Sequence, residues 1–248
     1  MSSSRLPGKI MKEVLGKPLL SYLVERLRYC NRVKNIILAT TVSSEDNPVV
    51  VLAQELGLKV FRGSENDVLD RFYGAATTFG AKHIMRITAD CPLIDPDLLD
   101  TLVEYYFSNK FDYASNNNPP TLPDGLDAEI FTFKALEYSH NHALLPSDLE
   151  HVTPYIRNHP ELFRIGNWSY DEDLSRLRWT VDESEDFEFV RQVIEAIYPG
   201  NKNFRTEDIL DLLHQRPELV KINAHFARNE GYLASLEEDK KLLKKKTG

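Results

Sequence analysis

Residues 83–109 have the sequence HIMRITADCPLIDPDLLDTLVEYYFSN, in which a strand-like run leads through an acid and a proline into a helical pattern. The run His83–Thr88 predicts a strand, and Asp97–Asn109 predicts a helix. Asp90 stands between them, where the carboxyl end of a parallel strand opens into the ligand crevice of an α/β sheet. The stretch therefore predicts an α/β unit with an acid at its ligand-binding edge.

The same alternation of strand and helix continues on both sides of this unit. Segments with helical periodicity, which end at a glycine or a turn, alternate with short apolar runs. Repeated strand–helix units imply an open α/β layer fold with a mostly parallel sheet. The expected helices are Pro18–Tyr29, Ser43–Gly57 and Val68–Phe79, and the expected strands are Asn35–Thr40, Lys59–Phe61 and Tyr113–Asn116.

The second half of the chain has a different character. The sequence Asn-Asn-Asn-Pro-Pro at residues 116–120 interrupts regular structure. Residues 116–167 are expected to form a protruding α+β elaboration within a single domain, 1–248. The expected elements are the strands Ala128–Phe133, Phe163–Trp168 and Leu177–Val181, and the helices Phe133–Leu144, Glu185–Ile197, Thr206–His214 and Glu230–Lys246.

Composition limits the kinds of partner. The chain has 248 residues, with 38 acids against 30 bases, and a net charge of −8. A nucleic-acid footprint needs clustered Lys and Arg, so nucleic acid is not expected as a partner. No run approaches the length of a membrane span, so no membrane insertion is expected, and Cys30 and Cys91 provide neither a disulfide framework nor a zinc site. The sequence suits a reducing cytoplasm.

The first candidate for a functional site is the segment from Ser2 to Lys9. Small residues such as Ser3 and Ser4 allow backbone N–H groups to turn toward an anion, and Arg5 and Lys9 supply the cations that phosphate oxygens prefer. The composition is that of a phosphate cradle, although it matches no standard phosphate-loop motif. A polar chain terminus is the alternative interpretation.

Two acids that follow apolar runs are candidates for a metal site. Asp90 and Asp182 each stand where an apolar run ends, and two carboxylates can jointly hold Mg²⁺ on a nucleotide phosphate. Asp95, which precedes Pro96, is interpreted instead as the cap of the following helix. The acids at 183, 185 and 186 are interpreted as complements to a helix dipole.

A third set of polar residues lies in the middle of the chain. Asp127 and Glu129 alternate on one predicted strand and therefore share a face, which is able to bind sugar hydroxyls. Solubilising an edge strand is the alternative role for these acids. His151 is a candidate base, and helix capping or a buried hydrogen bond is its alternative role.

Taken in order, these segments resemble the cytidylyltransferase family of the spore coat polysaccharide biosynthesis protein F type. That group is related to the synthetases of CMP-activated acidic sugars such as CMP-3-deoxy-manno-octulosonate and CMP-acylneuraminate. The match runs from Ser2 to about Val190, and its seven short motifs are specific because they occur in order. They are Ser4-Arg5-Leu6-Pro7-Gly8-Lys9, Gly16-Lys17-Pro18-Leu19, Arg62-Gly63-Ser64, Arg86-Ile87-Thr88-Ala89-Asp90-Cys91-Pro92-Leu93, Gly125-Leu126-Asp127-Ala128-Glu129, Glu150-His151-Val152-Thr153-Pro154 and Thr180-Val181-Asp182.

The resemblance implies a three-layer, mostly parallel, glycosyltransferase-A-like nucleotidyltransferase fold. It implies that CMP passes from CTP to a sugar or sugar-acid-like acceptor with release of pyrophosphate, in surface polysaccharide biosynthesis, with Mg²⁺ held by Asp90 and Asp182. A homodimer formed through residues 116–167 is also implied. The implied nucleotide-binding residues are Ser3, Ser4, Arg5, Lys9, Arg62, Arg86 and Asp90, those with a catalytic role are Arg5, Lys9, Asp90 and Asp182, and the acceptor-binding residues are Asp127, Glu129 and His151.

One departure from the family pattern concerns the start of the chain. In the family, an apolar strand followed by Ala-Arg precedes the segment that begins here at Met1. We therefore expect an upstream start that makes Met1 an internal methionine, with a shortened protein as the alternative. Two other functions stay open: a glycosyltransferase that uses a nucleotide-sugar, and a degenerate nucleotide-binding protein.

Overall fold

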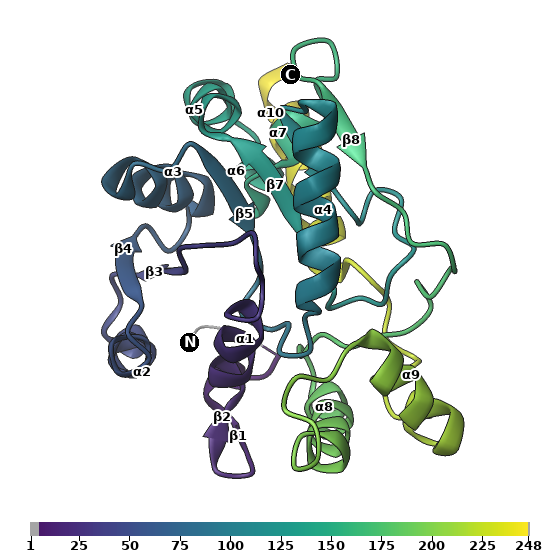
Figure 1. Cartoon of the computed structure of the whole chain (residues 1–248). Coiled ribbons are helices and arrows are strands. Elements are labelled where there is room, and N and C mark those ends of the chain that lie inside the picture. Colours follow the sequence, from purple (N-terminus) through teal and green to yellow (C-terminus); the bar gives the residue numbers. More distant parts are fainter. Residues whose placement is uncertain (1–4, 248) are drawn as a thin grey trace.

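A four-stranded mixed sheet forms the centre of the computed structural model, which describes residues 5–247 (Figure 1). Its strands are β5 (His83–Arg86), β6 (Tyr113–Ser115), β7 (Glu129–Thr132) and β8 (Ile165–Asn167), in the order β5-β7-β6-β8. β7 runs antiparallel to both neighbours, and β6 runs parallel to β8. The sequence pattern predicted a mostly parallel sheet. The observed sheet is mixed, because β7 lies between β5 and β6 and runs antiparallel to both.

Alternate residues of the central strands supply two separate cores. Ala114 and Ile130 face the larger core, which α4 (Pro96–Asn109) covers, while Tyr113 and Phe131 face the smaller one. The period of two in a strand makes this division, since successive side chains point to opposite faces. The smaller core is covered by α3 (Val68–Phe79), α5 (Phe133–His142), α6 (Pro146–His151) and α7 (Pro154–Arg157).

A second, two-stranded sheet lies beside the first. β3 (Ile37–Thr41) and β4 (Lys59–Gly63) are parallel and pair along their whole length, with α2 (Asn47–Glu55) and α3 packed against them. Between β3 and β5 lies a cavity of about 400 Å³. Its apolar lining includes Ile37 and Ala39 on one side and Ile84 and Met85 on the other. Within residues 5–247, β3 and β5 each pair with a neighbouring strand along one edge only.

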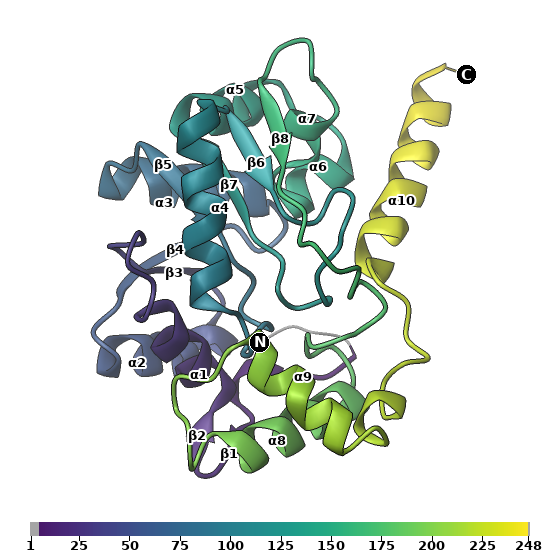
Figure 2. The ribbon, with the colours of Figure 1, turned by 45° about the vertical axis from the view of Figure 1, so that its right-hand side comes forward.

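Some of the helices lie at the lower edge of the molecule (Figures 1 and 2). A short hairpin of β1 (Glu13–Val14) and β2 (Lys17–Pro18) leads into α1 (Leu19–Leu27), whose buried side chains join the larger core. α8 (Ser184–Ile197) and α9 (Thr206–Gln215) pack on each other. The last helix, α10 (Glu230–Thr247), returns to pack against α6. The remaining turns are the 3₁₀ helices η1 (Lys9–Met11), η2 (Ser44–Asp46) and η3 (Leu219–Lys221).

Most predicted elements are present. The helix predicted at Val68–Phe79 has those bounds, and Asp95 caps α4 as expected by accepting a hydrogen bond from the backbone N–H of Asp97 (2.9 Å). The strand predicted at Leu177–Val181 is wrong. Trp179 and Thr180 both donate to the carbonyl of Asp124, and Val181 donates to that of Asp90, so no ladder with a single partner strand forms.

Residues 116–167 are part of the main sheet. The segment contains β7 and β8, two of its four strands, together with α5 to α7, and it is therefore continuous with the core. Among the described residues, no helix has the length and apolar character needed to cross a membrane.

Candidate active site

A cavity of about 410 Å³ opens beyond the carboxyl end of β5. Thr88 and Asp90 line it from the loop after that strand, and Thr180 and Asp182 line it from the segment before α8. The loop 123–129, helices α6 and α7, and the start of α10 form the other walls. The site is therefore where an open α/β sheet is expected to bind a ligand.

Lys9 joins two of the predicted site residues. Its Nζ lies 2.7 Å from Asp90 Oδ2 and 2.7 Å from Asp182 Oδ1, so a single cation bridges carboxylates that are far apart in sequence. Gly8 takes a left-handed conformation (φ 67°) just before η1, which turns the chain into this position. Burial opposes ionisation of Lys9 and Asp90, but their attraction outweighs it, raising the pKa of Lys9 and lowering that of Asp90.

Arg5 lines the cavity described above. Its guanidinium contacts Asp182 (3.2 Å), Glu183 (3.2 Å) and Glu230 (3.0 Å). The structure therefore brings the predicted site residues Arg5, Lys9, Asp90 and Asp182 together. The predicted contacts of Ser3 and Ser4 lie outside the described residues.

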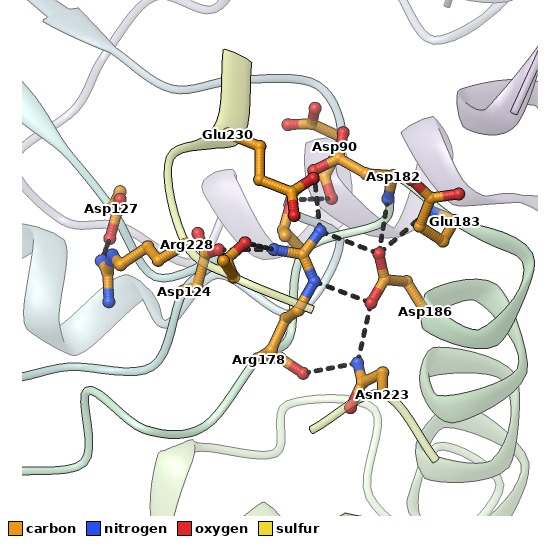
Figure 3. Close-up of polar contacts among 12 residues, drawn as sticks. Asp90, Asp124, Asp127, Arg178, Asp182, Glu183, Asp186, Asn223, Arg228 and Glu230 are labelled. Atoms are coloured by element: carbon orange, nitrogen blue, oxygen red, sulfur yellow. Dashed lines mark hydrogen bonds and ion pairs between the residues drawn. The ribbon is translucent and has the colours of Figure 1, made fainter. Parts of the chain in front are cut away.

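The buried guanidinium of Arg178 organises the acids around this cation site (Figure 3). It binds Asp124 (2.8 Å), Asp182 (2.9 Å) and both oxygens of Asp186 (2.9 and 3.0 Å). Asp186 also accepts the backbone N–H groups of Asp182 and Glu183, which closes the first turn of α8. Burial by itself would raise the pKa of Asp186. The hydrogen bonds from Arg178 and from the backbone have the larger effect, so the pKa of Asp186 is lowered from its ordinary value. The network holds the backbone of Asp182 in place.

Gly125 allows the loop 123–129 to approach the site closely. Its φ of +109° lies outside the range that L side chains readily adopt, and a Cβ there would lie 2.4 Å from the backbone nitrogen of Thr180. This contact accompanies the bonds from Trp179 and Thr180 to the carbonyl of Asp124. Glycine at 125 is therefore needed to place the acids of this loop beside the cation site.

Asp127 faces the cavity from the same loop. It pairs with Arg228, which also donates to the carbonyl of Leu122 (2.9 Å). Burial raises the pKa of Asp127 to about 7, although Arg228 acts in the opposite direction. Asp127 is therefore a carboxyl group that changes charge near neutral pH.

Glu129 and His151, the other predicted acceptor residues, also line the cavity but have partners of their own. Glu129 is buried and accepts from Arg86 (2.8 Å), Tyr113 (2.6 Å) and Thr153 (2.6 Å). His151 forms a hydrogen bond with Ser235 of α10 (3.0 Å). Glu129 thus anchors the cavity floor, with the predicted nucleotide-binding residue Arg86 as one of its partners.

Arg62 lies apart from this group. Its guanidinium donates to the carbonyls of Thr41 (2.8 Å) and Ser43 (2.6 Å) and to Asn47 (2.8 Å), which fixes the turn between β3 and α2. It does not line the cavity that Asp90 and Asp182 line.

Sequence reasoning missed several residues that build the site. Asp124 lies in a Pro-Asp-Gly sequence, which is typical of a turn, and Arg178 lies in the apolar run Leu177–Val181. That isolated charge was a signal, because a charge within a buried run requires partners. Arg157, Arg228 and Glu230 had no local signal.

The donor chemistry around Lys9 suits a hard divalent cation. Asp90 and Asp182 present carboxylate oxygens to one positive centre, and Mg²⁺ in nucleotide sites takes one or two carboxylates and completes its shell with phosphates and water. Within residues 5–247 there is no cluster of three or more metal-binding side chains. The pair fits a cation that arrives with a phosphate ligand.

Comparison with known proteins gives consistent matches across almost the whole chain. A relative from Methanocaldococcus jannaschii, the uncharacterized protein MJ1063, is 39% identical over 232 residues, 93% of each chain. The spore coat polysaccharide biosynthesis protein SpsF of Bacillus subtilis is 33% identical over 88% of this chain and 92% of its own. A cytidylyltransferase structure from Leptospira borgpetersenii superposes with a TM-score of 0.84 at 33% identity, covering 89% of this chain and 92% of that one. The family model described as cytidylyltransferase matches residues 1–223, and the chain therefore belongs to the cytidylyltransferase family of nucleotidyltransferases.

Proposed function

We propose that this enzyme transfers CMP from CTP to a hydroxyl group of a sugar-like acceptor and releases pyrophosphate. The observation that carries the proposal is the placement of the Lys9 ammonium 2.7 Å from both Asp90 and Asp182, with Arg5 alongside. Cations beside paired carboxylates suit a triphosphate that arrives with a divalent metal.

The polar residues in and beside the cavity suit two ligands. Arg5 and Lys9 would bind the triphosphate, since Arg offers a planar fork and Lys a point charge to phosphate oxygens. Asp127, Asn117 and His151 also line the cavity, where their side-chain oxygens and nitrogens would bind acceptor hydroxyls. Asp90 and Asp182 would hold Mg²⁺, which supplies charge neutralisation at the phosphates when bound.

The proposed reaction is a displacement at the α-phosphorus of CTP. The acceptor oxygen forms a bond to that phosphorus, the bond to the β-phosphate oxygen breaks, and pyrophosphate leaves with the electron pair. Arg5 and Lys9 stabilise the negative charge that develops on the leaving oxygens. Asp127, whose pKa burial raises to about 7, takes the proton of the acceptor hydroxyl, because a base with a pKa near the working pH transfers protons efficiently.

The acceptor class and the assembly are parts of the same proposal. The similarity to SpsF, a spore coat polysaccharide biosynthesis protein, supports a sugar-like acceptor. We infer a homodimer formed through residues 116–167, which sedimentation of the purified protein tests.

A pyrophosphate-release assay tests the reaction. The full chain is given Mg²⁺, a panel of sugars and sugar acids, and one of CTP, ATP, GTP or UTP. We expect release with CTP that depends on the acceptor, and loss of release in Lys9→Met but not in the exposed control Lys221→Met. Equal release with all four nucleotides, or release without any acceptor, would contradict the proposal.

A further inference from the structure

Arg228, which precedes α10, contacts the segment 122–127 at two points. Its guanidinium donates a hydrogen bond to the carbonyl of Leu122 (2.9 Å) and pairs with the carboxylate of Asp127 (Figure 3). The two contacts lie on either side of Gly125, the residue of this segment with a positive φ (109°). Arg228 therefore connects the start of the segment to the acid at its end.

The guanidinium of Arg228 supports Asp127 without lining the cavity. Asp127 lines the cavity, and so do Ala227 and Asn229, the neighbours of Arg228 in the chain, but Arg228 itself does not. The Arg228 side chain is 14% exposed, so little water screens its attraction to the carboxylate. Arg228 is thus placed to act on a ligand in the cavity through Asp127.

Opposing effects set the charge of Asp127. Burial is the largest effect and raises its pKa to about 7, and the nearby carboxylates of Asp124 and Glu129 act in the same direction. Arg228 is the largest effect that lowers this pKa, and a hydrogen bond with the Asn117 side chain also lowers it. An opposite charge this close typically lowers a carboxyl pKa by about one to three. Without Arg228, Asp127 would therefore be mostly protonated at neutral pH.

Contacts of flanking residues hold the Arg228 segment in place. Before it in the chain, Asn223 donates to the carboxylate of Asp186 (2.9 Å). After it, Ser235 of α10 forms a hydrogen bond with His151 of α6 (3.0 Å). These contacts do not involve Asp127, so the guanidinium is fixed independently of its pair with that residue. A supporting group that is itself fixed holds a side chain in one orientation.

We propose that Arg228 is a positioning residue, which orients the Asp127 carboxylate toward the acceptor and favours its ionised form. The inference rests on the proposed function, in which Asp127 takes the proton of the acceptor hydroxyl. Arg228 binds Oδ1 of Asp127, so the proton passes to Oδ2 as the O–H bond breaks and the acceptor oxygen bonds to the α-phosphorus. Arg228 keeps its charge throughout, because a guanidinium is not deprotonated at any working pH.

The pH dependence of kcat/KM distinguishes this role from a purely structural one. In wild type the acidic limb should have its midpoint at about pH 7. In Arg228→Gln the midpoint should move to about pH 8 or above, because loss of the opposite charge raises the pKa of Asp127. Arg228→Lys retains the charge and should keep the midpoint near that of wild type, with a lower plateau, because an ammonium lacks the planar fork that makes both contacts. An unmoved midpoint in Arg228→Gln would overturn the inference.

A second measurement needs no turnover. Carbon-13 NMR of the Asp127 carboxyl in the nucleotide-free protein gives its pKa directly, and melting temperatures check that each variant is folded. Arg228→Gln should raise this pKa, whereas Arg164→Gln, which changes an exposed arginine outside the cavity, should not.

The outcomes separate the inference from the proposed function. An equal Asp127 pKa in wild type and folded Arg228→Gln contradicts the inference, and so does a pKa in Arg228→Lys raised as far as in Arg228→Gln. A raised pKa in Arg228→Gln, together with a wild type that releases no pyrophosphate with any acceptor, contradicts the proposed function and leaves the control of Asp127 by Arg228 supported.

Discussion

Lys9 Nζ lies 2.7 Å from Asp182 Oδ1, a contact between residues 173 positions apart. The same ammonium lies 2.7 Å from Asp90, so it occupies the space between the two carboxylates proposed to bind Mg²⁺. An ammonium and a divalent cation repel each other and compete for the same oxygens.

Lys9→Met should therefore raise the affinity of the nucleotide-free protein for a divalent cation, by about tenfold or more. Mn²⁺ binding followed by electron paramagnetic resonance measures this without any turnover. Lys221→Met serves as the control, and Asp90→Asn should weaken Mn²⁺ binding. Identical Mn²⁺ affinity in Lys9→Met and wild type would show that the ammonium does not compete.

The pKa of about 7 for Asp127 predicts the acidic limb of the activity profile. If the carboxylate accepts the hydroxyl proton, kcat/KM should rise with pH and level off above about 7. Asp127→Asn should lose activity at every pH, since an amide accepts no proton. A profile that is flat between pH 5 and 8 would exclude this role.

Stability should depend on pH through the same group. The folded-state pKa of about 7 lies above the ordinary value of 3.8, so between these values the folded protein binds more protons than the unfolded chain. The Asp127 contribution to the free energy of unfolding should therefore fall as pH rises from about 4 to about 7, and then stay constant. Urea unfolding at several pH values should show a shallower decline in Asp127→Asn than in wild type, and no such change in the exposed control Asp211→Asn.

Removing the Asp186 carboxylate should destabilise the protein by about 3 kcal/mol, because the buried charge of Arg178 would lose one of its carboxylate partners. The side chain of Asp186 is fully buried, and it also accepts two backbone N–H groups at the start of α8. Chemical unfolding of Asp186→Asn measures the loss. Glu185→Gln, which changes an exposed neighbour on the same turn, should stay within about 0.5 kcal/mol of wild type. A loss of similar size in both variants would show that the buried pair is not the cause.

Gly125→Ala should destabilise the protein by at least about 2 kcal/mol and reduce activity. The added Cβ would lie 2.4 Å from the backbone nitrogen of Thr180, and backbone atoms cannot give way as a flexible side chain does. Gly200→Ala is the matched control, since a Cβ there meets nothing closer than 3.9 Å. Thermal melting measures the loss of stability, and the pyrophosphate assay measures the loss of activity. Gly125→Ala with the stability and activity of Gly200→Ala would contradict the prediction.

Local patterns were sufficient to predict most elements. The apolar spacing and terminal glycine of Val68–Phe79 predict α3 with its observed bounds, and Asp95 before Pro96 predicts the cap of α4. Both depend on residues a few positions apart, which is why the sequence alone reveals them. The strand prediction at Leu177–Val181 is wrong for the opposite reason, because the backbone partners of this run are far away in the sequence. A buried apolar run has the same pattern whether its backbone pairs with one strand or with two separate loops.

The candidate site divides in the same way. Arg5, Lys9, Asp90 and Asp182 are recognisable from the sequence, because each belongs to a short motif whose residue types suit phosphate or metal binding. Arg157, Arg178 and Arg228 are assigned only by the fold, since their partners Tyr232, Asp186 and Asp127 come from other segments of the chain. Short-range order in the sequence therefore specifies helices, caps and motif residues, whereas the pairing of buried charges depends on which distant segments the packed core brings together.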